Sequence, residues 1–161
     1  MTASTSRGCH RVNERADQPS DSAAVRPNEN SEHAALRPSE VEVRMLARRQ
    51  RVPGIRALAA DMAMREDFDL DAIADLRLAV EEACATVLAN AEPESDLVCR
   101  LLVSTKLLEI NTSATLAEGK DPEIGALSLR ILRTLADSVD YWTSEGDDGR
   151  RFHVQLTKSQ P

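Results

Sequence analysis

The stretch Leu76–Ala91, LRLAVEEACATVLANA, decides the fold of this chain. Its apolar residues recur at intervals of three and four, which is typical of a helix with one buried face. Asp69 or Asp71 can cap the start of this helix, and the pair Glu92-Pro93 ends it. The core stripe predicted for the helix consists of Ile73, Leu76, Val80, Cys84, Val87 and Ala91.

Two adjacent glutamates, Glu81 and Glu82, interrupt the apolar run of this helix. At about 100° per residue, Glu81 lies on the flank of the core stripe, where Arg77 predicts a solvated i, i+4 ion pair. Glu82 points about 160° away from the stripe, onto a second face of small and partly apolar residues. A carboxylate there needs a partner that offsets its desolvation. This face is either covered by another helix or subunit, or it lines a ligand pocket.

The patterns on both sides of this helix predict one domain with helices and strands. The segments are a strand at 41–45, a helix at 55–63, strands at 97–104 and 107–112, a loop at 115–123, a helix from Ile124 to Leu135 and strands at 139–143 and 152–156. The order is therefore β-α-α-β-β-α-β-β. This order predicts an α+β fold, a two-layer sandwich with the helices on one face of a mixed sheet.

The chain has 161 residues and a formal net charge of −7. Residues 1–38 show no period and are rich in Ser, Asn and Arg, so we predict a disordered tail before one domain at 39–161. The tail has five arginines and five acidic residues, so the charge of −7 falls on the domain. Because an acidic domain binds phosphate backbones poorly, we do not expect nucleic acid as a partner.

The cysteines and histidines of the chain indicate neither a disulfide framework nor a metal centre. Cys9, Cys84 and Cys99 are odd in number and lack metal-like spacing, which favours free thiols in a reducing compartment. The three histidines share no ligand spacing, so no structural metal is predicted. No apolar run approaches about 18 residues and no signal peptide is recognisable, so we expect a cytoplasmic protein that does not contact a membrane.

The helix and the order of the elements around it resemble a known family. This is the RsbW-type anti-sigma factor and serine kinase family, which has the GHKL ATPase fold of histidine kinases and gyrase B. The resemblance covers about residues 41–158. The family pattern Glu-Ala-x-x-Asn-Ala is matched by EACATV at Glu82–Val87, and SLRILRTLADSVDYW is similar to the last helix and the following strand. The actinomycete sigma-B/sigma-F branch of this family typically has a segment like residues 68–84 of this chain, FDLDAIADLRLAVEEAC.

The resemblance also implies site residues. Glu82 would be the general base in phosphoryl transfer from ATP. Thr86 stands where the family has an asparagine that coordinates Mg²⁺, and Thr112 or Ser113 stands where an aspartate reads adenine. Gly125 alone remains of the second glycine-rich box. ATP or ADP with Mg²⁺ is therefore the implied cofactor, although its motifs are incomplete.

Three functions are compatible with these observations. The first is an anti-sigma factor that dimerises, sequesters a stress or sporulation sigma factor and is released by a STAS-domain anti-anti-sigma protein. The second is an ATP-dependent serine kinase that phosphorylates the STAS protein through Glu82. The third is a sensor in which Cys9, Cys84 or Cys99 responds to oxidation. The incomplete motifs favour the first function, because partner switching depends on surfaces rather than on catalytic groups.

Overall fold

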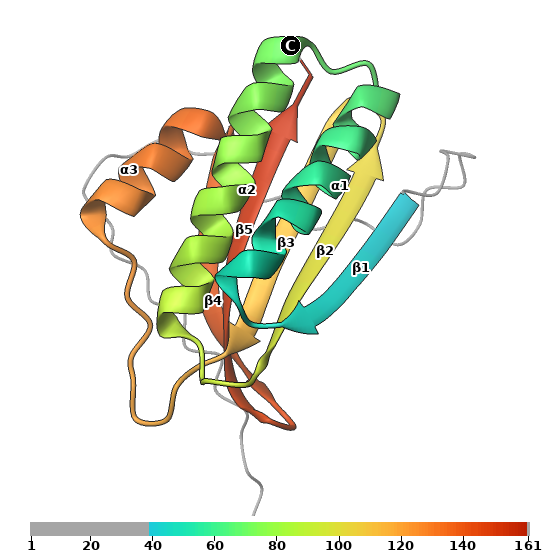
Figure 1. The fold of residues 1–161 in the computed structure, drawn as a ribbon. Helices are drawn as coiled ribbons and strands as arrows, with labels where there is room; N and C mark the ends of the chain where they lie inside the picture. Colours follow the sequence, from blue (N-terminus) through green and yellow to red (C-terminus); the bar gives the residue numbers. More distant parts are fainter. Residues whose placement is uncertain (1–38, 161) are drawn as a thin grey trace, which may run out of the picture.

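The structure is a computed structural model that describes residues 39–160. Within this range the strands and helices follow the predicted order in two layers, with the α-helices on one face of the sheet (Figure 1). The predicted α+β sandwich is confirmed, whereas the predicted tail and Cys9 lie outside the described residues. The elements are β1 (Ser39–Leu46), a 3-10 turn (Arg49–Arg51), α1 (Val52–Arg65), α2 (Leu70–Asn90), β2 (Asp96–Ser104), β3 (Leu107–Thr115), α3 (Ala126–Leu135), β4 (Ser138–Gly146) and β5 (Gly149–Ser159).

The strands form one sheet in the order β1-β2-β3-β5-β4, and every neighbouring pair is antiparallel. The prediction of a mixed sheet is therefore wrong. The crossover through α3 makes β4 run in the same direction as β3, but β5 lies between these strands and pairs with both. Because the two parallel strands are not neighbours, no parallel ladder forms.

Two tight turns set the register of the sheet. Lys106 has a φ of 61° in the turn between β2 and β3. Residues 147–148 join β4 to β5, and the next residue, Gly149, has a φ of 108°, which a residue without a Cβ adopts at little cost. Both strands are longer than predicted, because residues 144–146 pair with residues 149–151 beside this turn.

α2 is the central helix of the core. The Asp69 carboxylate caps the helix by accepting a hydrogen bond of 2.7 Å from the backbone N–H of Ala72. The predicted stripe is buried as far as Val87, whereas Ala91 follows the end of the helix and is half-buried. The stripe belongs to one hydrophobic core with inward-facing strand residues that include Leu101, Ile110, Phe152 and Val154.

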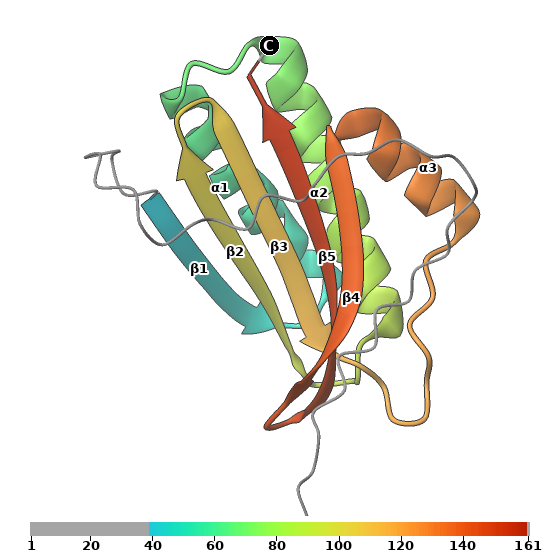
Figure 2. The same cartoon turned by 180° about the vertical axis from the view of Figure 1, so that it is seen from behind.

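The opposite face of the sheet is not covered by any helix of residues 39–160 (Figure 2). Strand residues on that face are mostly polar or charged, and they alternate with the core residues. The two sides of the sheet therefore differ in chemistry as well as in cover.

No helix in the described part of the chain is long and apolar enough to cross a bilayer.

Candidate functional site

A groove between α2 and α3 contains the glutamate that the sequence singled out. The groove has a volume of about 530 Å³. Both walls are helical, and the two helices lie side by side on the sheet (Figure 1). The lining residues are Leu78, Glu81 and Glu82 from α2 and Leu127, Arg130, Ile131, Thr134 and Leu135 from α3.

The short helix α3, which forms one wall of the groove, packs on the rest of the domain through one of its faces. Leu132 is fully buried in the core, and it is the only residue of α3 that is buried. Leu127 is 71% exposed, and across the groove Leu78 of α2 is 56% exposed. The groove therefore presents aliphatic side chains that no other part of residues 39–160 covers.

The two adjacent glutamates occupy different environments, as predicted. Glu81 is exposed, but its ion pair is with Arg56 of α1, so the predicted pair with Arg77 is wrong. An arginine that precedes a glutamate by four residues is the less favourable orientation on a helix, and α1 offers an alternative partner. Glu82 is half-buried in the groove and makes no hydrogen bond or ion pair with any described residue.

Thr86 lies one turn after Glu82 but does not line the groove. Its side chain is buried, and its Oγ1 has no hydrogen-bond partner among the described residues. The Thr86 hydroxyl is therefore a polar atom enclosed by the protein. The family resemblance implied a Mg²⁺ ligand at this position, which would have to be accessible to the ion.

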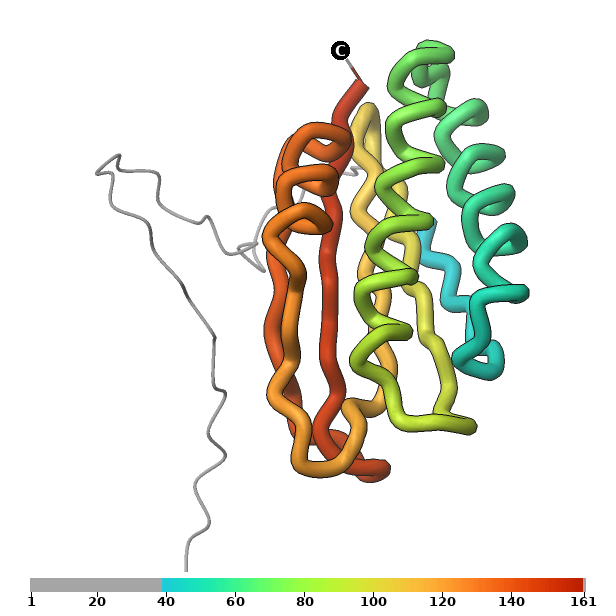
Figure 3. The backbone as a smooth tube through the Cα atoms, turned by 60° about the vertical axis from the view of Figure 1, so that its left-hand side comes forward, coloured from blue at the N-terminus to red at the C-terminus, as the bar shows by residue number. Residues whose placement is uncertain are grey.

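Asn90, another turn along α2, ties the helix to the loop at residues 116–125. Its side-chain Nδ2 donates to the backbone carbonyls of Thr86 and Glu123, both at 2.9 Å. Its Oδ1 accepts a hydrogen bond of 3.0 Å from the Glu123 N–H. The loop leads from β3 to α3, as the tube in Figure 3 shows. Asn90 was not predicted, although a buried amide near the end of an apolar helix indicates such a clamp.

A lysine strengthens the same junction. Lys120 Nζ donates a hydrogen bond of 2.9 Å to the backbone carbonyl of Ala89, which belongs to the last turn of α2. A cation at a helix C-terminus also interacts favourably with the helix dipole. Side chains of both the helix and the loop therefore hold the loop before α3 against α2.

The other implied nucleotide positions lie apart from the groove or at its margin. Thr112 is fully buried on the helix side of β3, and its hydroxyl donates to Cys99 Sγ at 3.8 Å. Ser113 points to the opposite face, where Arg151 contacts its hydroxyl at 3.3 Å. Gly125 is the N-cap of α3 and has ordinary negative φ, so its backbone conformation does not require glycine.

These residues do not fit a magnesium-nucleotide in the way the resemblance implied. A magnesium ligand must contact the ion directly, at about 2.1 Å. The Thr86 and Thr112 hydroxyls are enclosed by the protein, and the second already has a partner. Of the implied positions, Glu82 lies in the groove, and Gly125 precedes the groove residue Leu127 by two positions.

Cys84 and Cys99 are free and buried. Burial raises the pKa of Cys84, and burial raises the pKa of Cys99 to about 11. Both thiols are therefore protonated at neutral pH and unreactive as nucleophiles. Of the three cysteines proposed as sensors, two are thus packing residues, and Cys9 lies outside the described residues.

Two arginines in and just after β1 are engaged in ion pairs. Arg44 contacts Glu42 and Asp96, and Arg48 contacts Glu94 at 2.9 Å. These pairs offset the positive charges of Arg44 and Arg48.

Comparison with known proteins identifies relatives of this chain. Two curated proteins, both described as "Anti-sigma-F factor RsbW", come from Mycobacterium tuberculosis strains CDC 1551 / Oshkosh and ATCC 25618 / H37Rv. Each is 34% identical to this chain over 116 residues. The match covers 71% of this chain and 66% of each relative, so the chain spans just under two thirds of their length.

The fold also has a counterpart among solved structures. The crystal structure of the RsbU and RsbW domains of Rv1364c from Mycobacterium tuberculosis matches with a TM-score of 0.57 and 13% identity. The match covers 75% of this chain and 32% of that protein. No family model matches the sequence. On the identity with its curated relatives, the chain belongs to the RsbW-type family of anti-sigma factors.

Proposed function

We propose that the protein is an anti-sigma factor that sequesters an alternative sigma factor of the sigma-B/sigma-F type. The observation that carries this proposal is the 34% identity, over 71% of the chain, to relatives described as anti-sigma-F factors. The charge of the protein supports it, because a chain with a net charge of −7 complements the basic DNA-binding surfaces of a sigma factor. The protein acts in the cytoplasm, where RNA polymerase is found.

Transcription in vitro tests this proposal. The full chain is added in increasing amounts to core RNA polymerase with each alternative sigma factor of the same genome. We expect it to inhibit transcription from the promoters of one sigma factor and to co-purify with that factor alone. If no alternative sigma factor is bound or inhibited, the proposal is wrong.

Release of the sigma factor is proposed to follow partner switching. A STAS-domain anti-anti-sigma protein competes for the anti-sigma factor, which acts as a homodimer. Adding the STAS protein to the inhibited transcription reaction should restore transcription. Light scattering of the purified chain should give the mass of two copies. The mass of one copy would show that the protein does not act as a homodimer.

A serine kinase is the second candidate function, and the position of Glu82 favours it. A half-buried carboxylate without a partner in a groove is suitably placed to act as a base. The enclosed hydroxyls of Thr86 and Thr112 argue against nucleotide binding in the manner of the family. The test is incubation of the full chain with labelled ATP, Mg²⁺ and the STAS protein. Labelling that is lost in Glu82→Ala would support the kinase, and no labelling would reject it.

A further inference from the structure

The groove between α2 and α3 exposes an unusual amount of apolar surface. Among residues 39–160, four large apolar side chains are exposed, and two of them, Leu78 of α2 and Leu127 of α3, line this groove. Ile131 and Leu135 are half-buried in the same wall. Contiguous apolar surface on a helix layer marks an interaction site more often than a solvated face.

The shape of the groove suits one additional helix. Its walls are two neighbouring helices of one layer, and its volume of about 530 Å³ provides room for several side chains. An amphipathic helix binds in such a groove through apolar residues at i, i+3 or i+4, and i+7. The aliphatic side chains of Leu78, Leu127 and Ile131 would contact those residues.

The charges in the groove define the guest further. Glu82 has no partner among the described residues and loses part of its hydration in the groove, so a cation of the guest would stabilise it. Glu81 adds a second carboxylate to the same wall, although Arg56 pairs with it. Arg130 of α3 also lines the groove, but two carboxylates and one guanidinium leave a net negative charge there, which attracts lysine or arginine side chains and repels the phosphates of a nucleotide.

We propose that this groove binds one amphipathic helix of the sigma factor, whose apolar face carries a lysine or arginine that pairs with Glu82. The inference rests on the proposed anti-sigma function and adds the binding surface to it. The guest is part of a sigma factor because such a protein has basic helices that contact DNA, and masking one of them would also block its function.

Binding measurements on the full chain test the proposal. The dissociation constant for the sigma factor is measured by calorimetry for wild type, Leu127→Ser, Leu78→Ser and Glu82→Lys. We expect each groove variant to bind about tenfold more weakly or worse, because apolar anchors and a paired charge dominate such interfaces. The matched control is Met64→Ser, since Met64 is 54% exposed at the end of α1 and lies outside the groove. Its affinity should stay within about twofold of wild type.

Amide hydrogen exchange gives a second measurement that needs no variant. Sigma factor bound to the wild-type chain should slow exchange in α3 and on the groove side of α2. Unchanged exchange at residues 126–135 in the complex would overturn the proposal. Thermal melts of the variants show whether they fold, and the substitutions at the exposed residues Leu78, Leu127 and Met64 should leave the melting temperature nearly unchanged.

The alternative occupants give distinct results. If an excess of Mg-ATP displaces the sigma factor, the groove belongs to a nucleotide and the proposal fails. If Leu127→Ser converts a dimer into a monomer, the groove belongs to a second copy, and the proposal fails as well. Equal affinities of wild type and all groove variants for the sigma factor would reject the groove as the binding surface but leave the proposed anti-sigma function intact. Failure of the wild-type chain to bind any sigma factor would reject both.

Discussion

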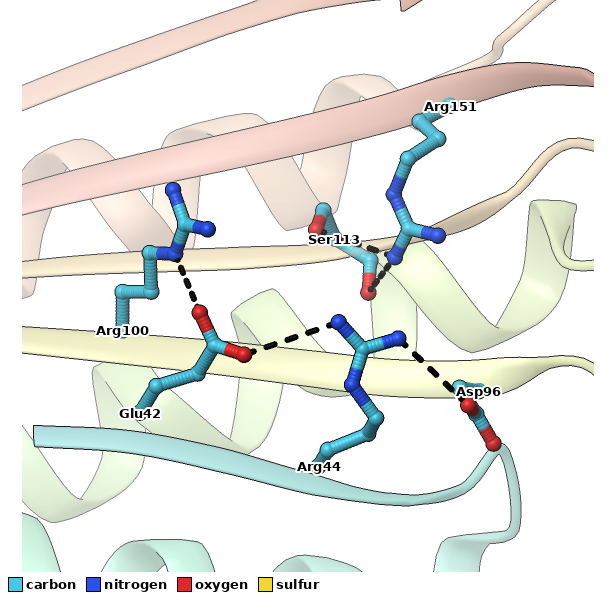
Figure 4. Close-up of polar contacts among 6 residues, drawn as sticks. All are labelled: Glu42, Arg44, Asp96, Arg100, Ser113 and Arg151. Carbon is cyan, nitrogen blue, oxygen red and sulfur yellow. Dashed lines mark hydrogen bonds and ion pairs between the residues drawn. The ribbon is translucent and has the colours of Figure 1, made fainter. Parts of the chain in front are cut away.

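The groove between α2 and α3 and the open face of the sheet differ in how their polar groups are satisfied. In the groove, Glu82 has no partner among the described residues, and Leu127 is 71% exposed. On the open sheet face, charged side chains contact each other across neighbouring strands (Figure 4). A surface whose polar groups are paired is complete without a partner, whereas exposed aliphatic side chains beside an unpaired carboxylate gain free energy when a partner covers them.

The open face shows this pairing in detail. The Glu42 carboxylate contacts both Arg44 at 3.5 Å and Arg100 at 2.7 Å. Arg151 donates to the hydroxyl and the backbone carbonyl of Ser113. Desolvation lowers the pKa of Arg151, and repulsion from Arg44 adds to this effect. The contacts on this face form two groups, an ion-pair cluster that joins β1 to β2 and the contact of Arg151 on β5 with Ser113 on β3 (Figure 4).

A second chain of contacts on this face centres on His153. The imidazole Nε2 lies 2.7 Å from Ser144 Oγ, and Nδ1 lies 3.3 Å from Asn111 Oδ1. The Trp142 ring stacks on the imidazole with a centroid separation of 5.0 Å. These contacts fix a polar ring on a sheet face that no helix of residues 39–160 covers.

The largest effect is expected from the residue that attaches the groove wall to the core. Leu132→Ala should lower the free energy of unfolding by about 3 kcal/mol, because it creates a cavity under α3. The exposed neighbour in the groove provides the control, since Leu127→Ala should change it by less than about 0.5 kcal/mol. Urea denaturation measures both. Equal losses of stability in the two variants would show that α3 does not have one face that packs on the core and another that is free to bind a partner.

The next largest effect compares two asparagines, one on each side of the sheet. Asn90→Ala removes the hydrogen bonds to Thr86 and Glu123 and should cost about 2 kcal/mol, because buried backbone groups lose their partners. Asn111→Ala on the open face should cost clearly less, since its contacts are 3.3 and 3.5 Å long and half-exposed. Denaturation curves test the ranking, and faster amide exchange at Glu123 in the first variant tests the mechanism.

A smaller effect concerns acid stability and the open face. Burial lowers the pKa of His153 from 6.5 to about 4, with further contributions from Arg151 and Arg100. Below pH 6.5 the unfolded chain binds a proton that the folded protein does not, so stability should fall as the pH decreases from 6.5 to 4. Above pH 6.5 both states are neutral at this residue, and its contribution is constant.

The expected loss over this window is about 1 to 2 kcal/mol. The full pKa difference corresponds to about 3 kcal/mol, and the partial exposure of the ring reduces it. His153→Gln should remove this part of the pH dependence, which denaturation at several pH values would measure. A variant with the same acid profile as wild type would show that other groups determine it.

The sequence was sufficient to predict the order of elements and the core side of α2, because both depend on local periodicity. The cap at Asp69 and the buried stripe through Val80 and Val87 are read from neighbouring residues. The antiparallel sheet could not be predicted in this way. It depends on β5 entering between β3 and β4, which is a long-range choice of pairing.

The environment of the second face of α2 was only partly predictable. Periodicity placed Glu82 and Thr86 together on that face, but the structure exposes Leu78 and buries Thr86. Burial there depends on α3 and on the loop that Asn90 holds, which are distant in sequence. The partner of Glu81 was missed for the same reason, since Arg56 lies on another helix.

The smallest effect is expected from the open-face ion pairs themselves. Glu42→Gln removes the carboxylate that Arg44 and Arg100 share, but all three side chains are at least one third exposed to solvent. Solvent and salt screen such pairs, so the variant should lose less stability than any variant above. The difference from wild type should disappear at about 1 M salt, where screening acts over about 3 Å. A loss that persists at high salt would mean that Glu42 contributes through packing rather than through charge. Charge pairing would then not be what makes the open face complete without a partner, and the contrast with the groove would fail.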